Sequence, residues 1–389
     1  MKTKVVPKEE AVSLLQRVLR ANTVNPPGNE LETALILRDF FDAHGVEAEV
    51  DEFLTGRANL IARLPGNGAG RGSLILCGHM DVVPVGGSAW DMEPFAAELR
   101  DGRIYGRGAS DMKSGLVATA VAVANLKQSG ATATGDIVFV ATAGEEVDCC
   151  GARRLVERGM LEDVEAAVIA EPTRGDVVLA HKGALWVEIA TRGKTAHGSM
   201  PQEGVNAIEH MYRVLGWLLE EFEFAVDPDP VLGEPTLNVS VINGGVKVNV
   251  VPDDCRLQID IRTVPAQDHG EILGMIERRL ESFRQSLHGF DCEVTVLSER
   301  LPVNTSTGER LARVAEVLRR ETYGAPSSRV AAPYYTDASV LVEARPDLPV
   351  VVYGPGDDRL AHQPNEWVSK ETFDGSIAFY ERLATAYFR

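Results

Sequence analysis

Histidines and acidic residues follow three short apolar runs of the sequence, at the point where each run ends. The runs are Ser73–Gly78, Asp136–Ala143 and Ala166–Ala170, and the residues that follow them are His79 and Asp81, Glu145 and Glu146, and Glu171. Near-continuous apolar runs are typical of buried strands in a parallel sheet. Because ligands bind beyond the carboxyl ends of such strands, we expect these five side chains to converge in one crevice.

Two loops add further residues of the types that bind metals. Asp111 lies in the glycine-rich segment Tyr105–Gly115, and His362 lies in Gly354–Glu366, after the last apolar run. Neutral imidazole and carboxylate oxygen are the ligands that Zn²⁺ accepts in hydrolytic sites. The set holds too many acids for one ion and fits two cations about 3.5–4 Å apart, bridged by one carboxylate. Without cations the acids would repel one another and raise their own pKa values, so we expect ions in the folded site.

Each of these residues has an ordinary explanation when it is taken alone. A histidine after a strand is usually a loop residue, and neighbouring glutamates are usually solvated surface. Their joint occurrence at strand ends, beside glycines that permit sharp turns, favours a metal crevice instead. Two other motifs are excluded, because Gly193-Lys194-Thr195 lacks the upstream glycine of a phosphate-binding loop and no H-E-x-x-H occurs in the sequence.

The elements that would position these residues alternate between strands and helices. Predicted helices lie at Asn29–His44, which Gly45 ends, and at Ser114–Gln128, which is apolar all round and expected to be buried. A buried strand at Leu348–Tyr353 and a helix at Lys370–Phe388 follow near the C-terminus. This alternation predicts an α/β fold, with a mostly parallel sheet flanked by helices.

After His181 the pattern changes to alternating strands and two amphipathic helices. The expected elements are Ala184–Thr191, a helix at Glu203–Phe222, Thr236–Ile242, Arg256–Arg262, a helix around Ile272–Phe283, and Cys292–Leu297. The first of these helices carries an apolar stripe of Val205, Ile208, Tyr212, Leu215 and Leu219. The order β-α-β-β-α-β is that of a ferredoxin-like unit. We therefore expect an inserted α+β domain at residues 182–298, between catalytic segments 1–181 and 299–389.

Composition limits the classes of partner. The 389 residues hold 39 Lys and Arg against 57 Asp and Glu, a net charge of −18 with a pI near 5.0. This acidity argues against nucleic acid and against an anionic membrane surface. The polar start Met1–Glu10 lacks the apolar core of a signal peptide, and the apolar stretch Leu116–Leu126 is too short to span a bilayer. With five scattered cysteines, the sequence predicts a cytoplasmic protein with free thiols.

Five ordered motifs of this sequence resemble those of one enzyme family. They are GHMDVVP at Gly78–Pro84, GRGASDMKSG within Tyr105–Gly115, AGEEV at Ala143–Val147, AEPT at Ala170–Thr173 and AHQPNE ending at Glu366. With TVNPPGNE at Thr23–Glu30, they resemble the acetylornithine deacetylase, succinyl-diaminopimelate desuccinylase, aminoacylase and carboxypeptidase G family of cocatalytic dizinc amide hydrolases. The resemblance covers nearly the whole chain, and it implies that the inserted domain acts as a lid and in dimerisation.

The resemblance assigns metal-binding roles in the predicted crevice. It implies that His79 and Glu171 hold one divalent ion and that Asp111 bridges to a second. Glu146 and His362 would hold that second ion. Zn²⁺ is the expected metal, with Co²⁺ and Mn²⁺ left open. Family members often have a cis peptide after the bridging aspartate, which here is the peptide between Asp111 and Met112.

The resemblance also implies three catalytic residues. Asp81 would hydrogen-bond the His79 ring and fix its tautomer. Glu145 would be the general base for a water held between the two metals, and would then protonate the leaving amine. His197, in Thr195–Pro201 (TAHGSMP), would stabilise the oxyanion, from the same chain or from the partner subunit of a dimer. A surface loop histidine is the ordinary alternative for His197.

Four further residues match positions that bind substrate in relatives. Asn238 lies in TLNVS and Arg262 in DIRT, and Arg262 suits a substrate carboxylate through its paired donors. An outward-facing arginine on a solvated strand is the alternative for Arg262. Gly354 and Gly356 would shape a substrate loop through exposed backbone N–H groups.

The predicted activity is metal-dependent removal of an N-acyl group from an amino acid. The resemblance leaves open exopeptidase action on a dipeptide or a carboxypeptidase substrate, because both reactions break an amide beside a free carboxylate. An inactive metal-binding scaffold on the same fold is a third possibility, which retention of every ligand and of Glu145 argues against. The resemblance further implies a homodimer formed through residues 182–298, a small N-acyl-amino acid or short peptide as substrate, and no nucleic acid or membrane partner.

Overall fold

The computed structural model describes residues 5–68, 72–130 and 133–389, so the first four residues of the polar N-terminal segment lie outside it. The chain divides into two units. Unit 1 runs to Ala180 and also holds Val303–Ala332 and Thr336–Arg389, whereas unit 2 holds His181–Pro302 and Pro333–Tyr335. Across the described ranges, no helix combines the length and apolarity needed to cross a membrane.

A six-stranded sheet forms the centre of unit 1. Its order is β1 (Ala48–Leu54), β2 (Arg57–Leu64), β6 (Asp136–Thr142), β3 (Ser73–His79), β7 (Val164–Ile169) and β15 (Val350–Val352). The four strands from β6 to β15 are parallel, and β1 and β2 add an antiparallel hairpin at one edge. The predicted mostly parallel sheet is therefore confirmed. His79 is the last residue of β3, and Glu145 and Glu171 follow the carboxyl ends of β6 and β7.

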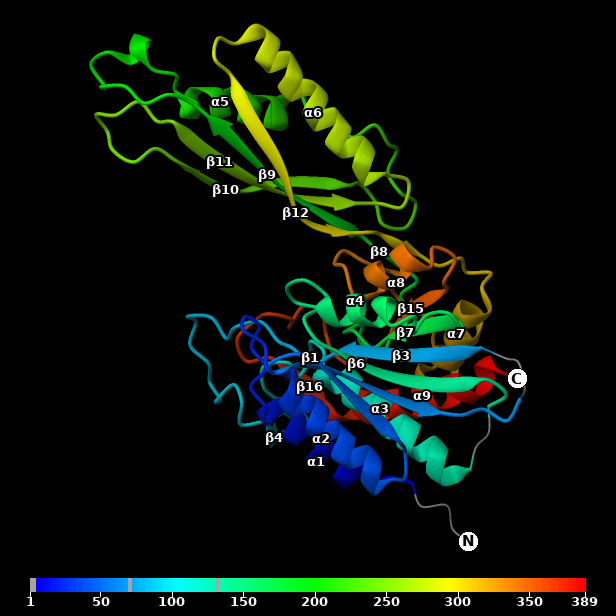
Figure 1. Cartoon of the computed structure of the whole chain (residues 1–389). Helices are drawn as coiled ribbons and strands as arrows, with labels where there is room; N and C mark the ends of the chain where they lie inside the picture. The colour runs from blue at the N-terminus through cyan, green and yellow to red at the C-terminus, as the bar shows by residue number, and fades with distance from the viewer. Residues whose placement is uncertain (1–4, 69–71, 131–132) are drawn as a thin grey trace. The chain divides into compact units, whose positions relative to one another are not determined.

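Helices cover both faces of this sheet (Figure 1). On one face lie α1 (Lys8–Arg20), α2 (Glu30–Ala43), α3 (Lys113–Ser129) and α9 (Lys370–Tyr387), whose apolar side chains join the main core together with those of α7 (Arg310–Tyr323). On the other face lie α4 (Cys150–Glu157) and α8 (Ala338–Ala344). Residues 113–126 of α3 are all buried, as its small apolar side chains predict, because such a helix can pack on every side.

Two small three-stranded sheets join loops of the chain. The first has the order β13 (Val303–Asn304), β8 (Ala180–His181) and β14 (Ala331–Ala332). The second has the order β16 (Trp367–Ser369), β5 (Arg103–Tyr105) and β4 (Glu98–Arg100). Because β16 pairs with β5, the loop that contains His362 runs beside the loop that contains Asp111.

Unit 2 is a four-stranded antiparallel sheet with two helices. The strands are β9 (Gly183–Arg192), β10 (Thr236–Gly244), β11 (Asp254–Thr263) and β12 (Asp291–Arg300), in the order β10-β11-β9-β12. Between them come a short 3-10 turn (Pro201–Glu203), α5 (Ala207–Glu220) and α6 (His269–Ser286). Both helices pack on one face, over alternate strand residues such as Leu257, Ile259 and Ile261 (Figure 1). The succession and strand order are those of a ferredoxin-like unit.

Three residues of the predicted apolar stripe face outward on α5, whereas Leu215 packs against the core of unit 2 and Val205 precedes the helix. Ile208, Tyr212 and Leu219 are 42%, 66% and 65% exposed. A second set of α5 residues fills the core instead, namely Ala207, Met211, Val214, Trp217 and Leu218. The helix is therefore apolar on two faces, and only one of them is covered within the described chain.

Candidate metal centre

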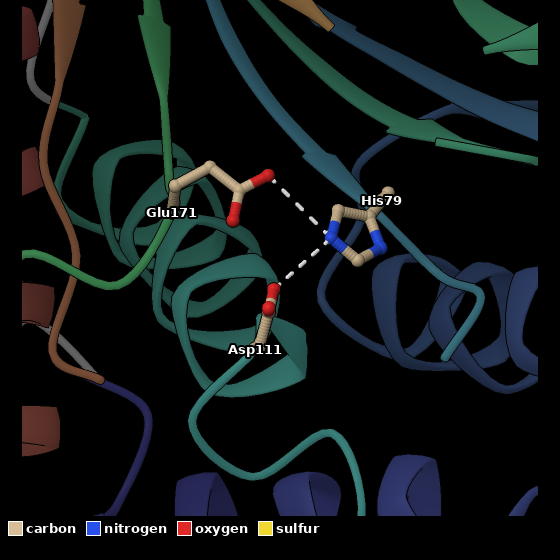
Figure 2. A group of neighbouring side chains, drawn as sticks. All are labelled: His79, Asp111 and Glu171. Carbon is tan, nitrogen blue, oxygen red and sulfur yellow. Dashed lines mark ion pairs between the residues drawn. The ribbon is translucent and has the colours of Figure 1, made fainter. Parts of the chain in front are cut away.

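The first group of side chains lies at the ends of β3 and β7 and at the start of α3. His79 is the last residue of β3, Glu171 follows β7, and Asp111 precedes α3. Figure 2 shows the three side chains pointing toward one another. His79 Nε2 lies 3.4 Å from Asp111 Oδ1 and 3.5 Å from Glu171 Oε1. One ligand atom from each residue thus lies within 4.8 Å of the others.

A second group shares Asp111 with the first. His362 Nε2 lies 3.3 Å from Asp111 Oδ2 and 3.2 Å from Glu146 Oε2. The two oxygens of the Asp111 carboxylate therefore face different histidines. Within residues 5–68, 72–130 and 133–389, these two groups are the clusters of histidine, cysteine and acid that could hold a metal ion. The peptide between Asp111 and Met112 is cis, which confirms that expectation.

Burial sets the electrostatics of the acids. It raises the pKa of Glu145 and of Glu171 well above their usual range, and it raises the pKa of Glu146 as well. Burial acts against the charge of Asp111 too, but hydrogen bonds to His362 and His79 hold its pKa below the ordinary value. A buried group of this kind needs positive charge beside it to stay ionised.

The same acids raise the pKa values of the two histidines beside them. Burial alone would lower the pKa of His79, but Glu171 and Asp111 beside it raise the pKa well above the ordinary value. Hydrogen bonds to Asp111 and Glu146 raise the pKa of His362 to about 10.

Asp81 is fully buried beneath the turn that carries Glu145 and Glu146. Its Oδ1 accepts the backbone N–H of Gly144 at 3.0 Å and of Glu145 at 3.1 Å, and its Oδ2 accepts the N–H of Glu146 at 3.2 Å. His79 Nδ1 lies 3.0 Å from the Asp81 backbone carbonyl and 3.5 Å from its carboxylate. The nearest hydrogen-bond partner of the His79 ring is thus the Asp81 main chain, while the carboxylate holds the turn.

Sequence reasoning overlooked one partner of Asp81. The Asn25 side chain donates to Asp81 Oδ2 at 2.8 Å, and Thr23 Oγ1 donates to the Met80 carbonyl at 2.7 Å. Both residues belong to the segment Thr23–Glu30 that carries part of the family resemblance. A buried carboxylate needs several hydrogen-bond donors. The polar residues beside the prolines of this segment were the sequence signal that could have indicated such a donor.

Three predicted residues lie on unit 2. His197 is exposed, and its Nδ1 lies 2.7 Å from Ser199 Oγ and 3.2 Å from the Ser199 backbone nitrogen. Asn238 and Arg262 lie on the sheet face that the two helices leave open. Arg262 is paired with Asp260 at 3.0 Å, and its guanidinium lies 5.7 Å from the ring centre of Tyr335.

Gly354 and Gly356 lie next to the segments that carry Glu171 and Asp111, and both are buried. The Gly354 N–H donates to Thr173 Oγ1 at 3.1 Å, so the expectation that it is exposed is wrong. A Cβ on Gly354 would lie 2.5 Å from the Glu171 carbonyl oxygen, and one on Gly356 would lie 2.1 Å from that of Ser110. Only glycine allows these backbones to approach so closely.

Comparison with known proteins assigns this fold and this set of residues to one class. Residues 75–386 match the family described as Peptidase family M20/M25/M40, and the chain belongs to that family. It is 29% identical to a protein from Staphylococcus aureus (strain MRSA252) named probable succinyl-diaminopimelate desuccinylase, over 98% of each chain. It is 34% identical to the acetylornithine deacetylase of Myxococcus xanthus, over 85% of each chain.

Solved structures share the fold. The M20 family metallo-carboxypeptidase of Sulfolobus solfataricus has a TM-score of 0.80 at 21% identity, covering 97% of this chain and 99% of its own. A Bacillus subtilis protein described as a dinuclear metal binding peptidase from the M20 family has a TM-score of 0.73 at 17% identity, covering 98% of each chain. The chain is therefore a metal-dependent amide hydrolase of this family.

Proposed function

We propose that this protein hydrolyses the amide bond of an N-acyl-amino acid at a centre of two divalent ions. The observation that carries the proposal is the geometry of Asp111, whose two oxygens face His79 at 3.4 Å and His362 at 3.3 Å. One carboxylate facing two ligand sets is the arrangement that a bridged ion pair needs. His79 and Glu171 would hold one ion. Glu146 and His362 would hold the other.

The residues fit such ions. Bonds of 2.0–2.2 Å in a tetrahedral zinc site place two ligand atoms about 3.3–3.6 Å apart, and the four ligand pairs here lie 3.2 to 3.5 Å apart. In the described part of the chain, the buried atom Glu146 Oε1 has no hydrogen-bond partner, and His79 Nε2 faces the carboxylates of Asp111 and Glu171. Unpartnered buried polar atoms are costly unless a ligand binds them. Imidazole with carboxylate favours Zn²⁺, and Co²⁺ and Mn²⁺ are the alternatives.

Glu145 is proposed as the general base. Bound divalent ions would lower the pKa of a coordinated water and polarise the amide carbonyl. Glu145 Oε2 lies 4.0 Å from His79 Nε2, beside the ligand cluster. The carboxylate would accept the proton of the attacking water and return it to the leaving nitrogen. Burial raises the pKa of Glu145, which suits a group that must both take up and release a proton. Asp81 supports this role by holding the backbone of the Glu145 turn.

Residues of unit 2 are proposed to bind substrate. His197 would stabilise the oxyanion through a hydrogen bond from its ring, from the same chain or from a partner subunit. Arg262 would bind the substrate carboxylate with its paired donors. Asn238 lies on the same face of the sheet, and its side-chain amide would donate a hydrogen bond to the substrate. Gly354 and Gly356 would shape the substrate loop through their close packing.

We also propose a cytoplasmic homodimer formed through residues 182–298. The support is the exposed stripe on α5, because large apolar side chains in one row on a surface are characteristic of interfaces. Val246 and Val248, in the loop after β10, are 87% and 101% exposed and enlarge the apolar surface of unit 2. The resemblance supports the same unit as the dimerisation domain.

The relatives leave two substrate classes to be separated. The similar sequences are named as a desuccinylase and a deacetylase, whereas the Sulfolobus solfataricus structure is named as a carboxypeptidase. The acetylornithine deacetylase has the higher sequence identity of the two named relatives, 34% over 85% of the chain. We therefore propose N-acyl-amino acids as the first candidate substrate class. Exopeptidase action on short peptides is the second candidate.

The test is a hydrolysis panel with zinc-, cobalt- and manganese-loaded protein. It includes N-acetylornithine, N-succinyl-diaminopimelate, simple N-acetyl-amino acids, N-acyl-glutamates and dipeptides. We expect kcat/KM for one N-acyl-amino acid to exceed that for every dipeptide. A dipeptide as the best substrate would favour the exopeptidase, and metal binding without hydrolysis of any compound would overturn both candidates.

A further inference from the structure

Glu366 is a buried acid for which the proposed chemistry has no use. It follows His362 by four residues, and its side chain is 0% exposed. Its Oε1 accepts the backbone N–H of Ser110 at 2.7 Å and of Asp111 at 2.9 Å. Its Oε2 accepts the N–H of Gly108 at 3.1 Å and Nη1 of Arg107 at 2.7 Å. All four donors belong to the loop that ends at Asp111.

Other contacts join the same two segments. The Gly106 N–H donates to the Glu366 carbonyl at 2.9 Å, and β16 continues the pairing from Trp367 to Tyr105. Arg107 is also buried, and its Nη1 lies 3.3 Å from the Gln363 carbonyl oxygen. The loop of Asp111 and the loop of His362 are therefore held to each other by the acid between them.

We propose that Glu366 is a positioning residue that holds Asp111 where its carboxylate can bridge two ions. The inference rests on the proposed function, because it takes Asp111 as the bridging ligand. A bridging carboxylate must meet two ions at once, so a small backbone shift costs more there than at a ligand of one ion. The hydrogen bond from the Asp111 N–H to Glu366 fixes that backbone at the ligand itself.

The chemistry of the four contacts requires a carboxylate. A carboxylate accepts on both oxygens, whereas an amide accepts on one and donates from the other. Glu366→Gln would therefore lose two of the four contacts in either orientation, and it would leave the Arg107 charge buried without its partner. The double variant Arg107→Gln with Glu366→Gln removes that unpaired charge. It replaces the single variant in the test if the single variant folds poorly.

The test measures zinc affinity by competition with a chelator at 25 °C, together with the visible absorption spectrum of cobalt-loaded protein. We expect Glu366→Gln, and the double variant, to bind zinc about 10- to 100-fold more weakly than wild type and to change the cobalt spectrum, because outer partners of metal ligands have effects of this size. The control is Asp176→Asn. Asp176 is equally buried and pairs with Arg319 at 2.9 Å, but it contacts none of the proposed ligands in the hydrogen bonds of the described chain. This control should lose thermal stability and keep zinc affinity and the cobalt spectrum.

The outcomes separate this inference from the proposed function. Wild-type zinc affinity and an unchanged spectrum in a folded Glu366 variant would overturn the positioning role alone. Equal weakening in Asp176→Asn would also overturn it, because general loss of stability would then explain the effect. A wild-type protein that binds no zinc would overturn the proposed function, and this inference with it.

Discussion

Glu145 is the residue on which turnover should depend most and metal binding least. Its carboxylate contacts the ligand cluster only at 4.0 Å from His79, and we assign it to neither ion. We predict that Glu145→Ala retains both ions and loses kcat by a factor of at least about 10²–10⁴, the usual contribution of a general base. Metal analysis and steady-state kinetics on the same sample measure both quantities.

The control for Glu145→Ala is Glu162→Ala, an exposed acid of the same unit. This control should leave kcat unchanged. Full activity in Glu145→Ala would contradict its role as general base, and loss of the metals would show that it acts as a ligand instead.

His181 predicts how stability depends on pH. It is fully buried, and burial lowers its pKa to about 4, from an ordinary value of 6.5. Between pH 6.5 and pH 4 the ring is therefore protonated in the unfolded chain and neutral in the folded chain. Because protonation then favours the unfolded chain, the free energy of unfolding decreases as the pH falls from 6.5 toward 4. Between pH 7 and pH 5 the loss amounts to roughly 2 kcal/mol.

The measurement is urea unfolding of wild type and His181→Gln at pH 7 and pH 5. We expect the stability of the variant to fall less over this interval, whatever its stability at pH 7. Parallel losses in the two proteins would show that His181 is not the group responsible for the pH dependence.

Among the secondary-structure elements, α3 depends on a close approach to the end of β7. Gly115 lies in its first turn, and a Cβ there would lie 1.9 Å from the Ala170 carbonyl oxygen, next to Glu171. Gly115→Ala should therefore destabilise the protein by about 1–3 kcal/mol, as overpacking does. The control is Gly274→Ala in α6, where the nearest atom is the mobile end of Arg278 and alanine should be neutral or stabilising.

Thermal unfolding of the two glycine variants measures this difference. If Gly115→Ala is as stable as wild type, the backbone of α3 can withdraw from β7, and the close approach is not needed to place Glu171.

The sequence predicted those elements whose apolar pattern is strong. The buried strands β3, β6 and β7 and the helices α2, α3 and α9 begin and end within two residues of their expected ends. Strand β1 was not predictable from the sequence, because its residues AEVDEFL are acidic and half-exposed at the sheet edge, so no apolar run marks it. The stripe of α5 was recognised as a pattern, but a helix with two apolar faces does not reveal which face is covered.

The candidate site was predictable because each side chain follows a strand or lies in a glycine-rich loop. His79, Asp111, Glu146, Glu171 and His362 come together as expected. The roles of Asp81 and Glu366 toward backbone N–H groups were not predictable, because hydrogen bonds to the main chain leave no residue pattern in the partner segment. Only the folded turn shows them.

At the level of the whole molecule, the α5 stripe predicts self-association. We expect light scattering to give twice the mass of the chain, and Tyr212→Glu to reduce it to that of a monomer, because a charge at a buried interface is costly. Val317→Glu, at a residue of unit 1 that is 54% exposed, is the control and should leave the mass unchanged. A monomeric wild type would contradict the dimer and exclude a partner's His197 from the site.

The net charge of −18 is also a property of the whole molecule. Five acids lie in or beside the ligand groups: Asp81, Asp111, Glu145, Glu146 and Glu171. Two divalent ions would offset up to four of these charges, so the pocket need not repel a substrate carboxylate.

Removing the ions should lower the unfolding temperature, because ions that bind the folded chain stabilise it relative to the unfolded chain.

The most direct test of the central claim is zinc anomalous diffraction from crystals of zinc-loaded protein. The account predicts two peaks about 3.5–4 Å apart in each chain, both in contact with Asp111. One peak would be bound by His79 and Glu171, and the other by Glu146 and His362. A single peak, or two peaks that do not share Asp111, would contradict a bridged two-metal centre.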